Sequence, residues 1–161
     1  MPSFTAEPPR HRLAGAALVA LLTLASCASP PKPTLVAATL QAGAASNPDV
    51  RKRASPLVVR VYELRSAAAF ESADFVSLYE RDQATLAAEM IGREEFVLRP
   101  GESRNWDKVA APDTKFIGVM AAFRDIERAR WKSIVPIKPG VKNTLTIRAD
   151  DIAIEAKAVA P

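Results

Sequence analysis

The stretch Leu57–Leu64 reads LVVRVYEL and decides the fold class of the chain. Its first, third and fifth residues are aliphatic, so they share one face of an extended strand, whereas Arg60 and Tyr62 lie on the other face. β-Branched and aromatic residues of this kind favour strands. We therefore predict a β-strand here, with one face in the hydrophobic core.

Other short strands are predicted on both sides of this one, separated by turn-forming residues. Thr34–Ala42 precedes it, and the nearly continuous apolar run at residues 116–123 is typical of a central strand. Pro136 favours an edge strand over residues 131–137, because proline cannot donate to a strand ladder. The remaining predicted strands are residues 94–98, 103–108, 144–148 and 152–155. Seven or eight short strands of this kind indicate a mainly β fold, a two-sheet β-sandwich.

Residues 66–91 differ in kind from the predicted strands. They are rich in Ala, Glu and Leu, and their apolar residues recur at helical rather than alternating spacings. Ser72 or Asp74 can cap a helix over residues 75–81. We expect one or two short helices inserted between strands.

The N-terminus is typical of a secreted precursor. Arg10 and Arg12 precede the apolar run at residues 13–25, which is too short to span a membrane. The run ends in Leu-Ala-Ser-Cys, a lipobox, in which Cys27 is the acylated residue and the only cysteine of the chain. The predicted domains are therefore a lipoprotein signal peptide at residues 1–26, the acylated Cys27 with a Pro-rich tether at residues 27–33, and a β-sandwich domain at residues 34–161.

Acylation of Cys27 predicts attachment to a membrane through the N-terminal lipid. Several acyl chains together give durable anchoring, whereas one chain gives only marginal binding. Ala28 follows the cysteine, where enterobacterial-like sorting uses Asp to retain lipoproteins at the inner membrane. We therefore expect a protein of the outer membrane, lipid-anchored and facing the periplasm.

The composition excludes several classes of function. The only histidine, His11, lies in the predicted signal peptide, so the mature chain lacks the imidazole of Ser-His-Asp and Cys-His sites and of most zinc sites. Adjacent carboxylates such as Glu94 and Glu95 point to opposite faces of a strand and cannot act as an acid–base pair. A net charge of +4 without a clustered basic face does not favour nucleic acid. We expect no enzyme activity, no cofactor, no metal and no small-molecule substrate.

Residues 43–56, GAASNPDVRKRASP, form the most informative loop. Gly, Asn-Pro-Asp and Ser-Pro break every periodic pattern. Arg51, Lys52 and Arg53 are the only dense basic run of the chain. The simplest interpretation is a solvated loop, but long loops in compact domains are often functional.

Several motifs behind the lipobox together resemble one family, the TssJ (VasD-like) lipoproteins of the type VI secretion system. They occur in the family's order from about Thr34 to Glu155 and cover nearly the whole mature chain. The matching residues are Asn47-Pro48-Asp49, the run SPLVVRVYEL at residues 55–64, Phe70, Ala73-Asp74-Phe75, Leu78-Tyr79, Pro100-Gly101-Glu102, AAFRD at residues 121–125, and Trp131.

The resemblance implies a transthyretin-like β-sandwich with an inserted helical element, held at the inner leaflet of the outer membrane. It also implies a scaffold whose loop at residues 43–56 binds the periplasmic C-terminal domain of a TssM-like inner-membrane protein. Where the family commonly has a Gly-Arg-Pro-like stretch after the Asp, this chain has VRKRA. The residues expected to contact the partner are Asn47, Pro48, Asp49, Val50, Arg51, Lys52 and Arg53.

The alternative function is a periplasmic lipoprotein whose sandwich binds a small ligand or a glycan, with an enzyme in third place. A ligand-binding sandwich needs clustered aromatic residues on a concave face. Aromatic residues make up 6% of this chain, and most occupy positions predicted to be core. The sequence therefore favours protein–protein interaction.

Overall fold

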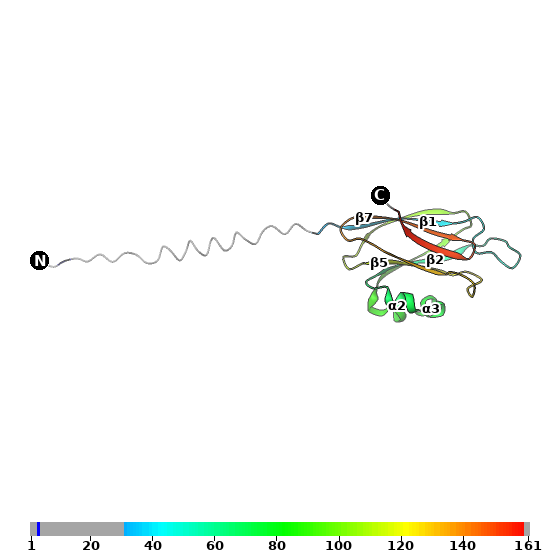
Figure 1. Cartoon of the computed structure of the whole chain (residues 1–161), viewed down its shortest axis with the longest axis horizontal. Coiled ribbons are helices and arrows are strands. Elements are labelled where there is room, and N and C mark those ends of the chain that lie inside the picture. The colour runs from blue at the N-terminus through cyan, green and yellow to red at the C-terminus, as the bar shows by residue number, and fades with distance from the viewer. Residues whose placement is uncertain (1–2, 4–30, 160–161) are drawn as a thin grey trace. The chain divides into compact units, whose positions relative to one another are not determined.

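The computed structural model describes residue 3 and residues 31–159 of the chain, and its folded unit begins at Lys32. Except for Ser3, the predicted signal peptide lies outside the described residues. So do Cys27 and residues 28–30 of the tether. Figure 1 shows the folded unit, with two layers of strands and a pair of helices on one side.

The predicted β-sandwich is confirmed, with two sheets of four strands each. The first sheet has the order β4-β1-β7-β8, and the second has the order β3-β2-β5-β6. The parallel pairing of β1 with β7 contrasts with the antiparallel pairing of the other neighbours. The strands are β1 Thr34–Ala42, β2 Leu57–Leu64, β3 Met90–Leu98, β4 Ser103–Ala110, β5 Phe116–Ala121, β6 Lys132–Pro136, β7 Lys142–Asp150 and β8 Ala153–Ala158.

Strand β2 contributes to two separate cores. Leu57, Val59 and Val61 face the first sheet in the main core, as their alternation predicted. Tyr62 and Leu64 on the opposite face are also fully buried, in a second core beneath the helices. Both faces of the second sheet are therefore covered. Strand β5 is central in this sheet, and β6, which ends at Pro136, lies at its edge, as predicted.

The inserted helical element consists of α2 (Ala68–Ser72), α3 (Phe75–Leu86) and the short 3-10 helix η2 (Ala87–Glu89). Asp74 caps α3 as expected, because its carboxylate accepts a hydrogen bond from the backbone N–H of Ser77 at 2.9 Å. Phe70 packs against Gly118 of β5, where an added Cβ would come within 3.1 Å of the Phe70 ring. A glycine at this position lets the helices lie close to the sheet.

The border between the helices and β3 differs from the prediction. The strand begins at Met90 and not at Glu94. Ala87 has a left-handed φ of 44°, which ends α3, and β3 then pairs with β2 from Leu64 onward across a register shift. Strands β4, β7 and β8 also extend beyond their predicted ranges, because ladder pairing continues past the alternating residues.

The topology places two groups of connections at opposite ends of the sandwich. The chain enters β1 at Thr34, near the turn at residues 138–141. Loop 43–56 follows the other end of β1, together with the β5–β6 connection and the β7–β8 turn. In Figure 1 this loop projects at the right-hand end of the folded unit, away from the start of β1.

Candidate functional site

Asn47 joins loop 43–56 to its neighbours. Its side chain is buried, its Nδ2 donates to the carbonyl of Pro56 at 2.7 Å, and its Oδ1 accepts from the backbone N–H of Arg124 at 2.8 Å. Its backbone N–H donates to the carbonyl of Asp151 at 2.7 Å. Asn47 also has a φ of 53°, a left-handed conformation that asparagine tolerates better than most residues. One residue thus fixes three connections at this end of the sandwich.

Asp49 folds the tip of the loop around its carboxylate. Its Oδ1 accepts from the backbone N–H groups of Arg51 and Arg53, at 2.8 and 3.0 Å. Its Oδ2 binds the guanidinium of Arg53 at 2.7 Å. These hydrogen bonds from the backbone and then the side chain of Arg53 hold the pKa of Asp49 below its usual value. The tip is therefore a closed turn held by a charged side chain.

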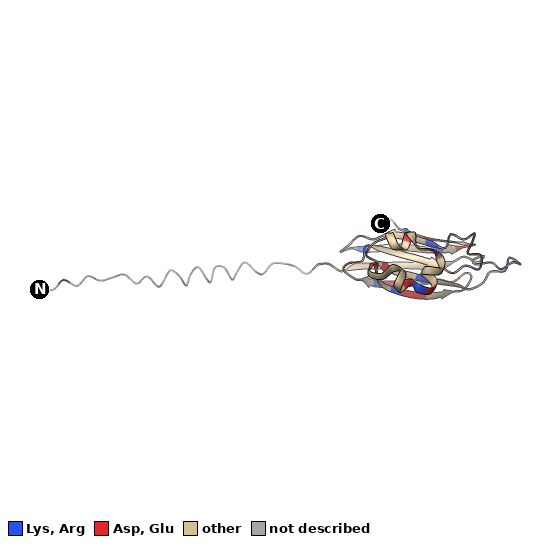
Figure 2. Ribbon diagram, turned by 90° about the horizontal axis from the view of Figure 1, so that it is seen from below, with Lys and Arg blue, Asp and Glu red and all other residues tan. Residues whose placement is uncertain are grey.

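The closed turn leaves an apolar side chain exposed next to basic ones. Val50 is 98% exposed, although burial of an aliphatic side chain is normally favourable in free energy. Arg51 and Lys52 are exposed beside it, and Lys52 has a left-handed φ of 62° that completes the turn. Figure 2 shows Lys and Arg, in blue, at the end of the projecting loop. This combination presents an exposed apolar side chain followed by positive charge.

The structure divides the predicted site residues into two groups. Val50, Arg51, Lys52 and Arg53 are exposed at the tip. Pro48 and Asp49 are half-buried, and Asn47 is buried, so these three position the loop. That all seven contact a partner stays a prediction. The buried amide of Asn47 holds the loop in place through its hydrogen bonds to Pro56 and Arg124.

A groove of about 920 Å³ runs beside the loop, and sequence reasoning did not assign it. Residues 124–128 form its opposite wall, and the β7–β8 turn at Asp151 and Ile152 closes it. Within the wall, Asp125 pairs with Arg128 through Nε at 2.7 Å. The charged connection after β5 was the only sequence signal, since no local pattern shows that Arg124 lies against Asn47.

The paired carboxylates do not form an acid–base site. Glu94 and Glu95 lie on opposite faces of β3, as predicted. Glu94 lies within β3 and not at its start, where the sequence placed it. It accepts from Trp106 Nε1 at 2.8 Å and from Lys108 at 2.9 Å. Lys108 also binds the buried Glu63 at 2.7 Å, so this cluster bridges the two sheets.

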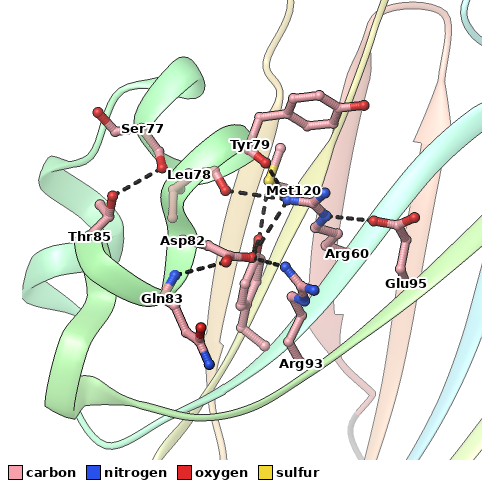
Figure 3. A network of polar contacts seen from close by, with 11 residues as sticks. Arg60, Ser77, Leu78, Tyr79, Asp82, Gln83, Thr85, Arg93, Glu95 and Met120 are labelled. Carbon is pink, nitrogen blue, oxygen red and sulfur yellow. Dashed lines mark hydrogen bonds and ion pairs between the residues drawn. The ribbon is translucent and has the colours of Figure 1, made fainter.

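Glu95 belongs to a second polar cluster, beneath the helices (Figure 3). At its centre the buried Asp82 binds Arg93 at 2.5 Å and accepts from the hydroxyl of Tyr62 at 3.2 Å. Arg60 links this centre to Glu95 at 2.7 Å and to the carbonyl of Tyr79 at 2.7 Å. Burial raises the pKa of Tyr62, which keeps its hydroxyl a donor. The cluster joins α3 to the sheet.

Two further findings concern the described residues alone. Among residues 31–159, no three His, Cys, Asp or Glu side chains converge as metal ligands would. In the same part of the chain, no helix has the length and hydropathy needed to cross a membrane.

Comparison with known proteins finds a matching family and similar solved structures. The family model for type VI secretion lipoproteins (VasD, EvfM, TssJ) matches residues 34–152. The T6SS lipoprotein TssJ1 from Pseudomonas aeruginosa has 33% sequence identity and a TM-score of 0.77, with 82% of this chain and 99% of that chain covered.

Two further solved structures are similar. Lip from Serratia marcescens, a membrane-bound component of the type VI secretion system, has 24% identity and a TM-score of 0.71, with 80% of this chain and 98% of Lip covered. A chain in the structure of the T6SS protein TssM C-terminal domain (869-1107) from EAEC has 26% identity and a TM-score of 0.64. The match covers 77% of this chain and 99% of that chain. Comparison with curated proteins gave no match.

Proposed function

This chain belongs to the type VI secretion lipoprotein family, and from that membership we propose that it anchors the envelope-spanning complex of that system. In this proposal Cys27 carries the lipid that holds the protein at the outer membrane, facing the periplasm. Loop 43–56 binds the periplasmic domain of a TssM-like inner-membrane protein. The role is mechanical attachment without catalysis.

One observation carries the proposal: the loop is a preformed tip at the end of β1 away from Thr34. Its closed turn is held by Asp49, and its base is held by Asn47. Binding by a preformed loop avoids most of the entropy loss of ordering a flexible one. The similarity to a chain in the structure of the TssM C-terminal domain supports a partner of that kind.

The side chains at the tip indicate which kind of partner surface they can bind. Val50 supplies an apolar side chain that a pocket on the partner can bury. Arg51 and Lys52 are exposed and raise the association rate with an acidic surface. Arg53 is already paired with Asp49, so its charge is partly neutralised within the loop.

The alternative of a ligand-binding sandwich gains no support from the placement of the aromatic rings. Tyr62 and Phe70 pack together with their ring centroids 5.7 Å apart, beneath the helices. Phe75 packs edge-on against Trp131 at 5.4 Å, between α3 and the start of β6. These rings fill the interface between the helices and the sheet.

The experiment is a binding measurement that separates the tip from the loop base. Replacing residues 49–53 with two glycines removes the tip but keeps Asn47 and the hydrogen bond between Ser55 and Ser46. We expect this variant to lose binding to the partner's periplasmic domain in surface plasmon resonance while its melting temperature changes little. Val50→Asp should weaken affinity at least tenfold, about 1.4 kcal/mol.

The charge contribution is tested at two salt concentrations. Arg51→Ala with Lys52→Ala should slow association, and the loss should shrink as salt rises, because exposed charges are screened. Lys157→Ala, an exposed lysine on β8, is the matched control and should bind normally. Unchanged affinity of the tip-deleted protein would place the interface elsewhere on the sandwich.

A further inference from the structure

The outer face of the first sheet changes character along its length. Strand register places residues side by side in rows across β4, β1 and β7. The row nearest the start of β1 holds Val109, Leu35 and Lys142, and the next holds Asp107, Ala37 and Thr144. Toward loop 43–56 the rows become polar, with Asn105, Thr39 and Thr146, then Ser103, Gln41 and Arg148.

Four exposed aliphatic side chains lie at this end of the sheet. Val109 is 63% exposed, Leu35 is 39% exposed, and Val141 and Val159 are each 48% exposed. Val141 accepts from the backbone N–H of Leu35 at 3.0 Å, and Val159 donates its backbone N–H to Thr144 at 2.8 Å. We call these four residues the apolar end patch. All four lie at one end of the same sheet, whereas single exposed aliphatic residues are normally scattered over a protein surface.

Hydrogen bonds hold the patch in a fixed shape. The side chain of Asn143 donates to the carbonyls of Lys138 at 2.9 Å and Val141 at 3.2 Å. Its Oδ1 accepts from the backbone N–H of Lys138 at 2.8 Å. Thr34 accepts from the backbone N–H of Gly140 at 2.8 Å. The turn beside β1 is thus fastened to the strand, and the patch is a preformed surface.

Lysines surround this patch. Lys32, Lys138 and Lys142 are all exposed at the same end, and Lys32 lies against Gly140 of the fastened turn. Aliphatic side chains flanked by lysines match a phospholipid surface, where the aliphatic groups enter the boundary layer and the ammonium groups meet phosphate. Two acidic residues also lie at this end: Asp107 in the second row, and Asp113 in the β4–β5 turn, which pairs with Arg65 at 3.5 Å.

The short length of the tether keeps this patch close to the membrane that holds the lipid anchor. Only six residues, 28–33, separate Cys27 from Thr34, and the seven steps from one Cα to the next span at most about 25 Å. Given the proposed acylation of Cys27, the membrane surface therefore lies within about 25 Å of the first row. The far end of β1 is roughly another 26 Å away, because its nine residues span eight steps of about 3.3 Å each.

We propose that the apolar end patch and its lysines dock on the phospholipid surface in which the lipid anchor is inserted. The inference rests on the proposed lipid anchorage and adds an orientation to it. Docking holds the sandwich upright on the membrane, so that loop 43–56 points toward the periplasm.

The test uses the chain from residue 27 with Cys27→Ser, which lacks acyl chains, so that any vesicle binding comes from the protein surface. The probe is vesicles of phosphatidylethanolamine with one quarter phosphatidylglycerol, and the measurement is co-sedimentation. We expect weak binding that is lost in high salt. Leu35→Gln with Val109→Gln should lower the bound fraction at least fivefold, and Lys138→Glu with Lys142→Glu should do the same.

Val97→Gln is the matched control, since Val97 on β3 is 53% exposed and lies in the other sheet. Circular dichroism checks that every variant is folded. Absence of binding by the Cys27→Ser chain, or an equal loss with Val97→Gln, would overturn the docking proposal. Dimers that dissociate with Leu35→Gln and Val109→Gln would also overturn it, since a second copy would then cover the patch. Palmitate incorporation into the unaltered protein tests the anchor separately.

Discussion

At the scale of the residue, Asn47 shows how a site residue can act without reaching the surface. The sequence marks it as part of an Asn-Pro-Asp turn, which predicts a loop and a contact residue. In the structure its amide is buried and binds Pro56 and the backbone of Arg124, which is 77 residues away in the sequence. That partner was not predictable, because no local pattern encodes a contact across such a separation.

We predict that Asn47→Ala lowers the free energy of unfolding by about 2–3 kcal/mol. The substitution leaves buried backbone groups unpaired, and alanine has no side-chain hydrogen bond to offset the cost of a positive φ. Asn47→Gly keeps the backbone conformation accessible and should lose about 1 kcal/mol less. Urea unfolding measures both variants. Equal losses would show that the φ of 53° contributes nothing.

Glu63 gives the stability of the protein a dependence on acid. Burial alone would raise the pKa of this carboxyl, but Lys108, the N–H of Ala111 and the hydroxyl of Thr114 outweigh burial and lower it. Hydrogen bonding to the same lysine lowers the pKa of Glu94. The folded state therefore binds protons more weakly than the unfolded state, so the stabilisation is complete above the ordinary glutamate pKa of 4.5 and is lost as the pH falls through the lowered value.

We predict that the free energy of unfolding decreases as the pH falls from about 5 toward 3, and that Glu63→Gln flattens this decrease. The measurement is urea unfolding at a series of pH values. Glu155→Gln is the control, since Glu155 is exposed on β8 and pairs only with the exposed Lys157 among the residues described. Parallel pH profiles for the Glu63→Gln and unaltered proteins would contradict the assignment.

At the scale of the element, strands β1 and β2 were predicted with their observed bounds, whereas the start of β3 was wrong. Alternation is a local property, and both correct strands carry it. The start of β3 depends on the left-handed turn at Ala87 and on a register shift against β2, which are set by packing. The burial of Tyr62 likewise depends on helices folding over the sheet, although its apolar ring was a usable signal.

In the candidate site, too, the local features were predictable from the sequence and the long-range contacts were not. Turn-forming residues and the basic run located loop 43–56, and the closed turn at Asp49 follows from a short side chain that can bind nearby backbone N–H groups. The groove was not predictable, because its second wall at residues 124–128 joins the loop only in the folded chain.

The helices depend on one buried carboxylate, which yields a prediction for this element. Asp82→Ala removes the carboxylate next to the largely buried guanidinium of Arg60 and the buried hydroxyl of Tyr62. Leaving these groups without it is expected to lower the free energy of unfolding by about 3 kcal/mol. Glu80→Ala, at an exposed position of the same helix, should change it by less than about 0.5 kcal/mol. Thermal unfolding followed by circular dichroism compares the two, and similar melting temperatures would show that the cluster does not hold the helices.

At the scale of the whole molecule, the proposed membrane contact and the proposed partner site lie at opposite ends of β1. The chain enters the strand at Thr34, beside the apolar end patch, and leaves it toward loop 43–56. Between these ends lies the continuous core of both sheets, with Leu40 and Val59 fully buried. A load applied between a membrane anchor and a partner at the loop is therefore carried by paired strands, which suits a part that connects two structures.

This separation predicts that anchoring and partner binding can be lost independently. Cys27→Ser should release the protein from the membrane fraction, because several acyl chains are needed for durable attachment and the surface patch binds only weakly. The released protein should bind the partner's periplasmic domain with unchanged affinity, since the tip and its supports at Asn47 and Asp49 lie at the other end of β1. The variant with residues 49–53 replaced by two glycines should show the reverse: membrane-bound but unable to capture the partner. Membrane fractionation paired with surface plasmon resonance measures both properties. Loss of partner affinity in the Cys27→Ser protein would show that the two ends are coupled.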